Sequence, residues 1–125
     1  MIVLDASVVL ATFLNEPGGD VLPSMTDDFR ICVFNLGEVA SKLTDKGFTP
    51  EEVRAAIEPL APSSIPLSVD RATQAGLWRR DTRRFGLSMG DRCCLALALE
   101  LGAEVYTADR VWSQLDLGVK VRVIR

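Results

Sequence analysis

Four acidic residues stand where they could form one reactive site, namely Asp5, Glu38, Asp91 and Asp109. The chain contains no histidine, so the commonest general base and the commonest metal ligand of proteins are both missing. Hydrolytic chemistry would therefore depend on carboxylates, and a carboxylate cluster suits hard cations such as Mg²⁺ or Mn²⁺. The pattern points first to metal-dependent phosphodiester chemistry.

The elements that would position these acids follow an α/β pattern, because short apolar runs alternate with longer helical patterns. We expect one domain over residues 1–125, with a mostly parallel sheet of about five strands and helices on both faces. Pro66 would place its strand at an edge of the sheet. The predicted strands are 2–4, 30–33, 65–69, 104–107 and 120–124.

Helical patterns connect these strands, and their boundaries carry recognisable caps. Thr49 and Glu52 form a predicted capping box around Pro50, for a helix that stops near Pro59 and Pro62. The other predicted helices are 6–14, 19–27, 35–46, 70–85 and 88–101. In such sheets, ligands bind outside the carboxyl ends of the strands. Asp5 and Asp109 each follow the carboxyl end of a predicted strand.

Each acid also has a purely structural interpretation. Asp91 fits a capping box that begins at Ser88, and Glu38 fits the same template with Asn35. Asp5 and Asp109 could be N-caps of the helices that follow them. The four together are harder to explain in this way, because converging carboxylates repel one another and a bound cation offsets that cost.

Two hydroxyl side chains and four arginines accompany the acids. Ser7 and Thr107 each lie two residues from a candidate acid and could hold it or order its waters, or they could be ordinary helix-start and strand residues. The arginines suit RNA phosphates, but a solvated helix face or a docking surface for an acidic protein segment would give the same pattern. They are Arg79, Arg80, Arg83 and Arg84.

Composition restricts the class of protein further. The hydrophobic fraction is 48% and the mean hydropathy is +0.20, which indicates either a well-filled core or an apolar interface with a partner. Cys32, Cys93 and Cys94 have neither zinc-site nor redox-motif spacing, so we expect a reducing compartment. Neither a signal peptide nor a membrane-spanning run is visible, and we therefore expect a cytoplasmic protein.

The formal net charge of −3 by itself argues against a nucleic-acid partner. The 17 acidic residues fall to 13 when the four candidate acids are set aside, one fewer than the 14 lysines and arginines. Two bound divalent cations would cancel the charge of the four acids. The rest of the surface would then tolerate a phosphate backbone.

The chain resembles the PIN-domain ribonucleases, specifically the VapC-type toxins of bacterial toxin–antitoxin pairs. The resemblance covers essentially the whole chain, and its most specific blocks are residues 3–7, 35–39, 86–96 and 107–110. It implies a PIN-like three-layer α/β/α fold and a Mg²⁺- or Mn²⁺-dependent endoribonuclease that acts on structured RNA, often tRNA or rRNA.

By the same resemblance, the acidic tetrad of the family falls on the four candidate acids, with its hydroxyls at Ser7 and Thr107. Asp5, Asp91 and Asp109 would ligate metal directly or through water, and Glu38 would ligate metal or position the attacking water. The family usually forms homodimers. A small antitoxin covers its groove and often inserts a basic side chain among the acids.

Two other classes of function remain open from the residues alone. A phosphatase with an aspartyl nucleophile could use Asp5, although Ser7 stands where such enzymes commonly carry a second aspartate. A non-catalytic module could instead grip a basic partner peptide with the same acids. Asp116 is a further acid whose position relative to the site the pattern leaves open.

Overall fold

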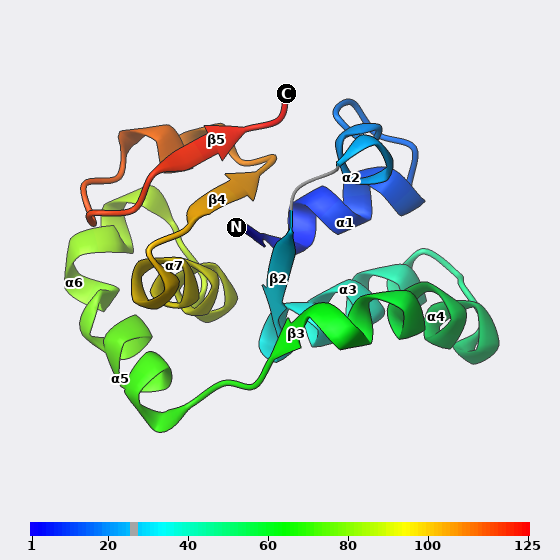
Figure 1. The fold of residues 1–125 in the computed structure, drawn as a ribbon, viewed down its shortest axis with the longest axis horizontal. Helices are drawn as coiled ribbons and strands as arrows, with labels where there is room; N and C mark the ends of the chain where they lie inside the picture. The colour runs from blue at the N-terminus through cyan, green and yellow to red at the C-terminus, as the bar shows by residue number, and fades with distance from the viewer. Residues whose placement is uncertain (26–27) are drawn as a thin grey trace.

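Five short strands form one sheet in which each described strand is parallel to its neighbours. The computed structural model describes residues 1–25 and 28–125. The order of the strands is β3-β2-β1-β4-β5, and Figure 1 shows helices on both sides of them. The strands are β1 (Ile2–Leu4), β2 (Phe29–Cys32), β3 (Ser64–Ile65), β4 (Glu104–Thr107) and β5 (Val121–Val123). The predicted α/β class is confirmed.

Two helical layers cover the sheet. One contains α1 (Ala6–Phe13), α2 (Val21–Ser24), α3 (Val33–Asp45) and α4 (Pro50–Ile57), which is followed by the 3-10 helix η1 (Glu58–Ser63). The other contains α5 (Val69–Leu77), α6 (Arg79–Thr82), α7 (Met89–Leu101) and the 3-10 helices η2 (Arg83–Phe85) and η3 (Arg110–Gln114). Within the described residues, no helix is long and apolar enough to cross a bilayer.

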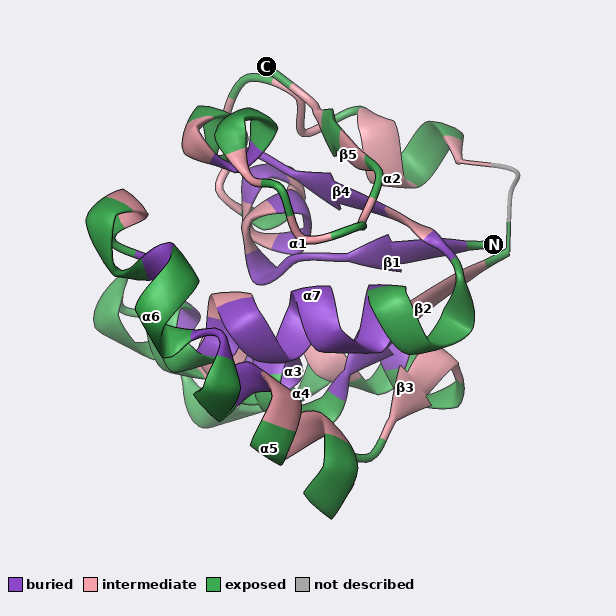
Figure 2. Ribbon diagram, turned by 90° about the vertical axis from the view of Figure 1, so that its left-hand side faces the viewer, coloured by how far each residue is buried: buried purple, intermediate pink, exposed green. Residues whose placement is uncertain are grey.

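The core divides into two halves because successive side chains of a strand point to opposite faces. Val3 and Val105 pack with α7 on one face, whereas Leu4 and Tyr106 pack with α1 and α3 on the other. Helix α7 is buried along most of its length (Figure 2), which explains the nearly continuous apolar run in its sequence. The three cysteines are buried free thiols within this core.

The helix predicted over residues 70–85 is confirmed only as far as Leu77, and its continuation as one helix is wrong. The chain forms α5, then turns at Trp78 into α6 and η2. Trp78 and Thr82 are both buried, and the Thr82 hydroxyl donates to the Trp78 carbonyl, a bond that often bends helices. Gly76 lowers helix propensity just before the break. Burial of Trp78 and Thr82 thus replaces one helix with three short segments.

Three other predicted elements differ from the structure by two residues or more at one end. The strand predicted at 65–69 contains only Ser64–Ile65 at the sheet edge, because Pro66 has no N–H to donate to the ladder. The helix predicted at 19–27 is Val21–Ser24, and residues 26–27 lie outside the described part. Helix α3 begins at Val33 with Cys32 at its N-cap. The capping box predicted for Asn35 and Glu38 is therefore wrong.

Candidate active site

The site lies where the chain changes direction across the sheet. From β1 the chain moves to β2 on one side, and after α7 it returns to β4 on the other side of β1. Such a switch point leaves an open crevice at the carboxyl ends of the two strands. Asp5 directly follows β1, and Asp109 stands two residues beyond the end of β4.

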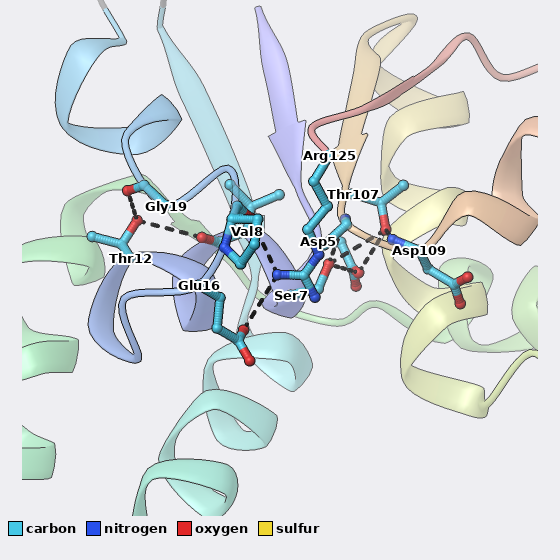
Figure 3. Close-up of polar contacts among 11 residues, drawn as sticks. Asp5, Ser7, Val8, Thr12, Glu16, Gly19, Thr107, Asp109 and Arg125 are labelled. Carbon is cyan, nitrogen blue, oxygen red and sulfur yellow. Dashed lines mark hydrogen bonds and ion pairs between the residues drawn. The ribbon is translucent and has the colours of Figure 1, made fainter.

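Asp5 occupies the N-cap position of α1, yet its side chain makes no capping hydrogen bond. Its carboxylate instead turns toward β4, where Oδ2 accepts the hydroxyl of Ser7 at 2.6 Å and that of Thr107 at 3.0 Å. Figure 3 shows these three side chains pointing toward one another between the two strand ends. The carboxylate is therefore held by neighbouring hydroxyls and is not used to begin the helix.

Ser7 and Thr107 also bind the loop that leads to Asp109. The Ser7 hydroxyl accepts the N–H of Ala108 at 2.9 Å, and Thr107 Oγ1 accepts the N–H of Asp109 at 3.1 Å. The two hydroxyl oxygens lie 3.4 Å apart. The pair thus connects the Asp5 carboxylate to the backbone of the second strand end and sets the spacing between the two acids.

Asp5 is almost completely buried, with 4% of its surface exposed. Its pKa is raised from 3.8 to about 6, chiefly by burial and also by the charges of Asp91 and Glu38, and the hydrogen bonds from Ser7 and Thr107 oppose this rise. The guanidinium of Arg125, also drawn in Figure 3, contacts Glu16 and Pro17. Among the described residues, no lysine or arginine forms an ion pair with Asp5.

Glu38 reaches the site from the second turn of α3. Its Oε1 accepts the side-chain amide of Asn35 at 2.7 Å, and the same amide donates to the carbonyl of Gly90 at 3.0 Å. A β-carbon placed on Gly90 would overlap the Glu38 carboxylate. Glu38 therefore packs directly on the first turn of α7, where burial and the charge of Asp91 raise its pKa.

Asp91 forms the predicted capping box at the start of α7. Its Oδ2 accepts the N–H of Ser88 at 2.9 Å, while its own N–H donates to the Ser88 hydroxyl at 3.2 Å. Burial is the main cause that raises the pKa of Asp91, and the charge of Asp109 adds to it. Asp91 therefore caps α7 and also lies near the other acids, so its role as a helix cap is compatible with a role in the site.

Asp109 is the exposed member of the group. It is the N-cap of η3, and its Oδ1 accepts the N–H of Val111 at 3.0 Å. The structure thus brings all four predicted acids together, since Asp91 interacts electrostatically with Asp5, Glu38 and Asp109. Asp116 instead lines a surface groove with arginines of α6 and η2.

The side chains fit a hard divalent cation in their chemistry. In the described ranges, no three carboxylate or thiol groups lie close enough together to hold one ion as they stand. The donors are all oxygens, however, and Mg²⁺ usually keeps several waters and needs only one or two carboxylates. A cation would also favour the ionised form of Asp5, whose pKa is raised to about 6, chiefly by burial.

Two residues of the site were missed in the sequence analysis, Asn35 and Gly90. Asn35 is fully buried, and its Oδ1 lacks a hydrogen-bond partner in the described structure. The available signals were an amide one helical turn before Glu38 and a glycine inside a helix start, where glycine is unfavourable. Both signals become meaningful only when α3 and α7 are seen in contact.

The comparisons with known proteins define the family. The sequence model of the PIN-domain family matches residues 2–117. The chain therefore belongs to the PIN-domain family, whose VapC toxins are generally nucleases. No curated protein sequence matches the chain.

Solved structures with the same fold include toxin–antitoxin complexes and proteins named VapC or VapBC, and the match extends over nearly the full length of both chains. A toxin–antitoxin complex from Klebsiella pneumoniae is 16% identical with a TM-score of 0.78, covering 100% of this chain and 98% of that one. VapC20 of Mycobacterium tuberculosis, described as a sarcin–ricin loop cleaving toxin, is 18% identical with a TM-score of 0.76, covering 96% and 99%. VapBC-5 from the same organism is 23% identical with a TM-score of 0.66, covering 98% and 96%. At these identities the likeness is one of fold.

Proposed function

We propose that this protein is a Mg²⁺- or Mn²⁺-dependent endoribonuclease that acts as the toxin of a toxin–antitoxin pair. The observation that carries the proposal is the buried Asp5 carboxylate, which two hydroxyls orient and which has three further acids nearby. Burying such a group without a cation is costly. Membership of the PIN-domain family supports the same conclusion.

The chain's own residues would act mainly by orientation. Ser7 and Thr107 both donate to Oδ2 of Asp5, which leaves Oδ1 as the oxygen better placed for a metal. Asn35 holds Oε1 of Glu38, and the capping box holds Oδ2 of Asp91. Carboxylates fixed in this way lose little freedom when they bind a cation or orient a water, which lowers the entropic cost of the reaction.

Bound Mg²⁺ or Mn²⁺ would supply an activated water for in-line attack on phosphorus and would stabilise the charge that develops on the phosphate. Asp5, Asp91 and Asp109 are the proposed ligands, directly or through water. Glu38 would serve as a ligand or position the attacking water. This division of roles explains how hydrolysis proceeds in a chain without histidine.

The proposed substrate is structured RNA, such as tRNA or rRNA, and the proposed partners are a small antitoxin and a second copy of the chain. Support comes from the similar structures, among them a toxin–antitoxin complex and a toxin described as cleaving the sarcin–ricin loop. The first of these covers the whole of this chain.

The test is cleavage of total bacterial RNA by purified protein with Mg²⁺ or Mn²⁺. Parallel samples contain EDTA, the Asp91→Asn variant, or Asp45→Asn, which removes an exposed acid at the end of α3. We expect discrete fragments with wild type and Asp45→Asn, and none with EDTA or Asp91→Asn. A fully active Asp91→Asn protein would contradict the mechanism. So would the absence of cleavage by folded wild-type protein that mass spectrometry shows to be free of any co-purified antitoxin.

A further inference from the structure

The arginines of α6 and η2, which follow the bend at Trp78, are exposed to solvent. Trp78 and Thr82 are buried on the inner side, and the arginines between and after them are exposed. In the part of the chain that the structure describes, none of the four forms an ion pair. The exposed Asp81 stands within the same segment, so a chain with net charge −3 carries a local excess of positive charge there. The four are Arg79, Arg80, Arg83 and Arg84.

A groove of about 560 Å³ separates this cluster from the segment that follows η3. One wall consists of residues 80, 81 and 83–85, which include three arginines, Asp81 and Phe85, and the other consists of residues 114–117. The guanidinium of Arg84 lies 4.7 Å from the centre of the Phe85 ring, and stacking of this kind restricts its orientation. Arg79 does not line this groove. It lines an adjoining hollow with Gly76 and Leu77, and Arg80 and Arg83 lie between the two.

The groove continues toward the candidate active site. A second hollow shares Arg84, Phe85 and Gln114 with it and extends to Val111. The N–H of Val111 donates to the carboxylate of Asp109. On the other wall, Phe85 lies three residues before Ser88, which caps α7 and binds Asp91. Both walls therefore lead to elements that hold a site acid.

We propose that Arg80, Arg83 and Arg84 bind backbone phosphates of the RNA substrate on one side of the cleavage point. This inference rests on the proposed ribonuclease function and deepens it. Guanidinium groups contact phosphates bidentately, and an aromatic side chain beside them suits unpaired RNA. Because the whole chain is net negative, attraction of RNA has to come from a local surface of this kind.

Asp116 allows a test in which removal of a charge should strengthen RNA binding. It lies in the groove with the three arginines, where its negative charge opposes an incoming phosphate. Asp116→Asn should therefore strengthen RNA binding by roughly twofold to fivefold. Removing an acid that had merely supported the fold would weaken binding or leave it unchanged.

The experiment measures binding of a fluorescein-labelled RNA hairpin with an unpaired loop to the Asp91→Asn protein, in EDTA and over a range of salt concentrations. Arg83→Gln and Arg84→Gln should each weaken binding about tenfold. Each should also reduce the slope of log affinity against log salt by about 0.7. Arg79→Gln and Arg54→Gln remove the same charge outside the groove and should cost less than about threefold. In the active protein, Arg84→Gln should raise KM about tenfold and change kcat less than about twofold.

Equal losses for Arg79→Gln and Arg84→Gln would overturn the proposal, because general attraction would then explain the binding. Unchanged RNA binding by the groove variants, with loss of binding to polyglutamate, would assign the groove to an acidic protein partner instead. Failure of the ribonuclease proposal appears separately, as absence of cleavage by wild type. Circular dichroism of each variant excludes misfolding as the cause of a loss.

Discussion

Gly90 is the residue at which α7 leaves space for a reactive side chain. Any β-carbon there would overlap the Glu38 carboxylate, and the carbonyl of Gly90 also accepts the amide of Asn35. The φ angle of Gly90 is not positive, so the backbone conformation does not require a glycine there. The close contact between the two helices does.

Gly90→Ala should displace Glu38 while the fold remains intact. The overlap involves the end of a flexible side chain, so the free energy of unfolding should change by less than about 1 kcal/mol, aided by the better helix propensity of alanine. RNA cleavage should fall by at least about 100-fold. Gly37→Ala, on α3, meets no atom within 4 Å and serves as the control. Full activity of Gly90→Ala would show that the position of Glu38 is unimportant.

The Asp5 carboxylate should make the metal-free protein less stable as the pH rises. Its pKa is about 6 in the folded protein, against 3.8 ordinarily, so the folded state retains a proton that the unfolded state has lost between these values. Stability therefore falls from about pH 4 to pH 6, by up to about 3 kcal/mol from this residue.

Asp5→Asn should remove this loss. In EDTA at pH 7.5 the variant should be more stable than wild type by about 1–3 kcal/mol, and the difference should disappear near pH 4. Urea unfolding of both proteins across this pH range measures it. Lower stability of the variant at pH 7.5 would show that hydrogen bonding from Ser7 and Thr107 outweighs the cost of the buried charge.

At the scale of elements, the cap of α7 combines stabilisation with orientation of a site acid. Ser88 and Asp91 bind one another's backbone N–H groups, and the helix that follows carries much of the core. An almost identical box, formed by Thr49 and Glu52, begins α4 but contains none of the four acids.

Variants of these two caps can distinguish an effect on the stability of the fold from an effect on RNA cleavage. Ser88→Ala and Thr49→Ala should each lower the free energy of unfolding by about 1 kcal/mol. Only Ser88→Ala should also lower cleavage, by about tenfold, because Asp91 then loses part of its orientation. Denaturation curves and cleavage rates measured side by side check this. Equal activity of the two variants would contradict the orienting role of the cap.

At the scale of the whole molecule, the site concentrates negative charge at the carboxyl edge of the sheet, between elements far apart in sequence. Binding of a cation there should stabilise the folded state. At a metal concentration ten times the Kd, the gain is about 1.4 kcal/mol, which should raise Tm by several degrees.

Thermal unfolding with Mg²⁺ or Mn²⁺, and again after EDTA, measures this gain. Wild type and Asp45→Asn should show the same rise in Tm, reversed by EDTA. Asp5→Asn and Asp91→Asn should show little or none. Equal rises in all four proteins would place the cation elsewhere on the molecule.

Local patterns in the sequence predicted the fold class and most element positions, and they singled out the four acids as candidates. Strand-length apolar runs, the cap at Thr49 and the cap at Ser88 are local signals, because the residues that produce them lie within one turn or one strand. The α/β class and both of these capping boxes agree with the structure. Asp5 and Asp109 were expected at strand ends on the same basis, and they lie there.

The contacts that hold those acids could not be predicted in the same way, because they join elements far apart in the sequence. Asn35 and Gly90 are 55 residues apart, and Ser7 reaches Thr107 across 100 residues, so no local pattern records either contact. The break at Trp78 has the same origin, since burial of Trp78 against α7 overrides a helical pattern that continues through residue 85. Local propensity selects the elements, but packing between distant elements determines where each ends and which side chains meet.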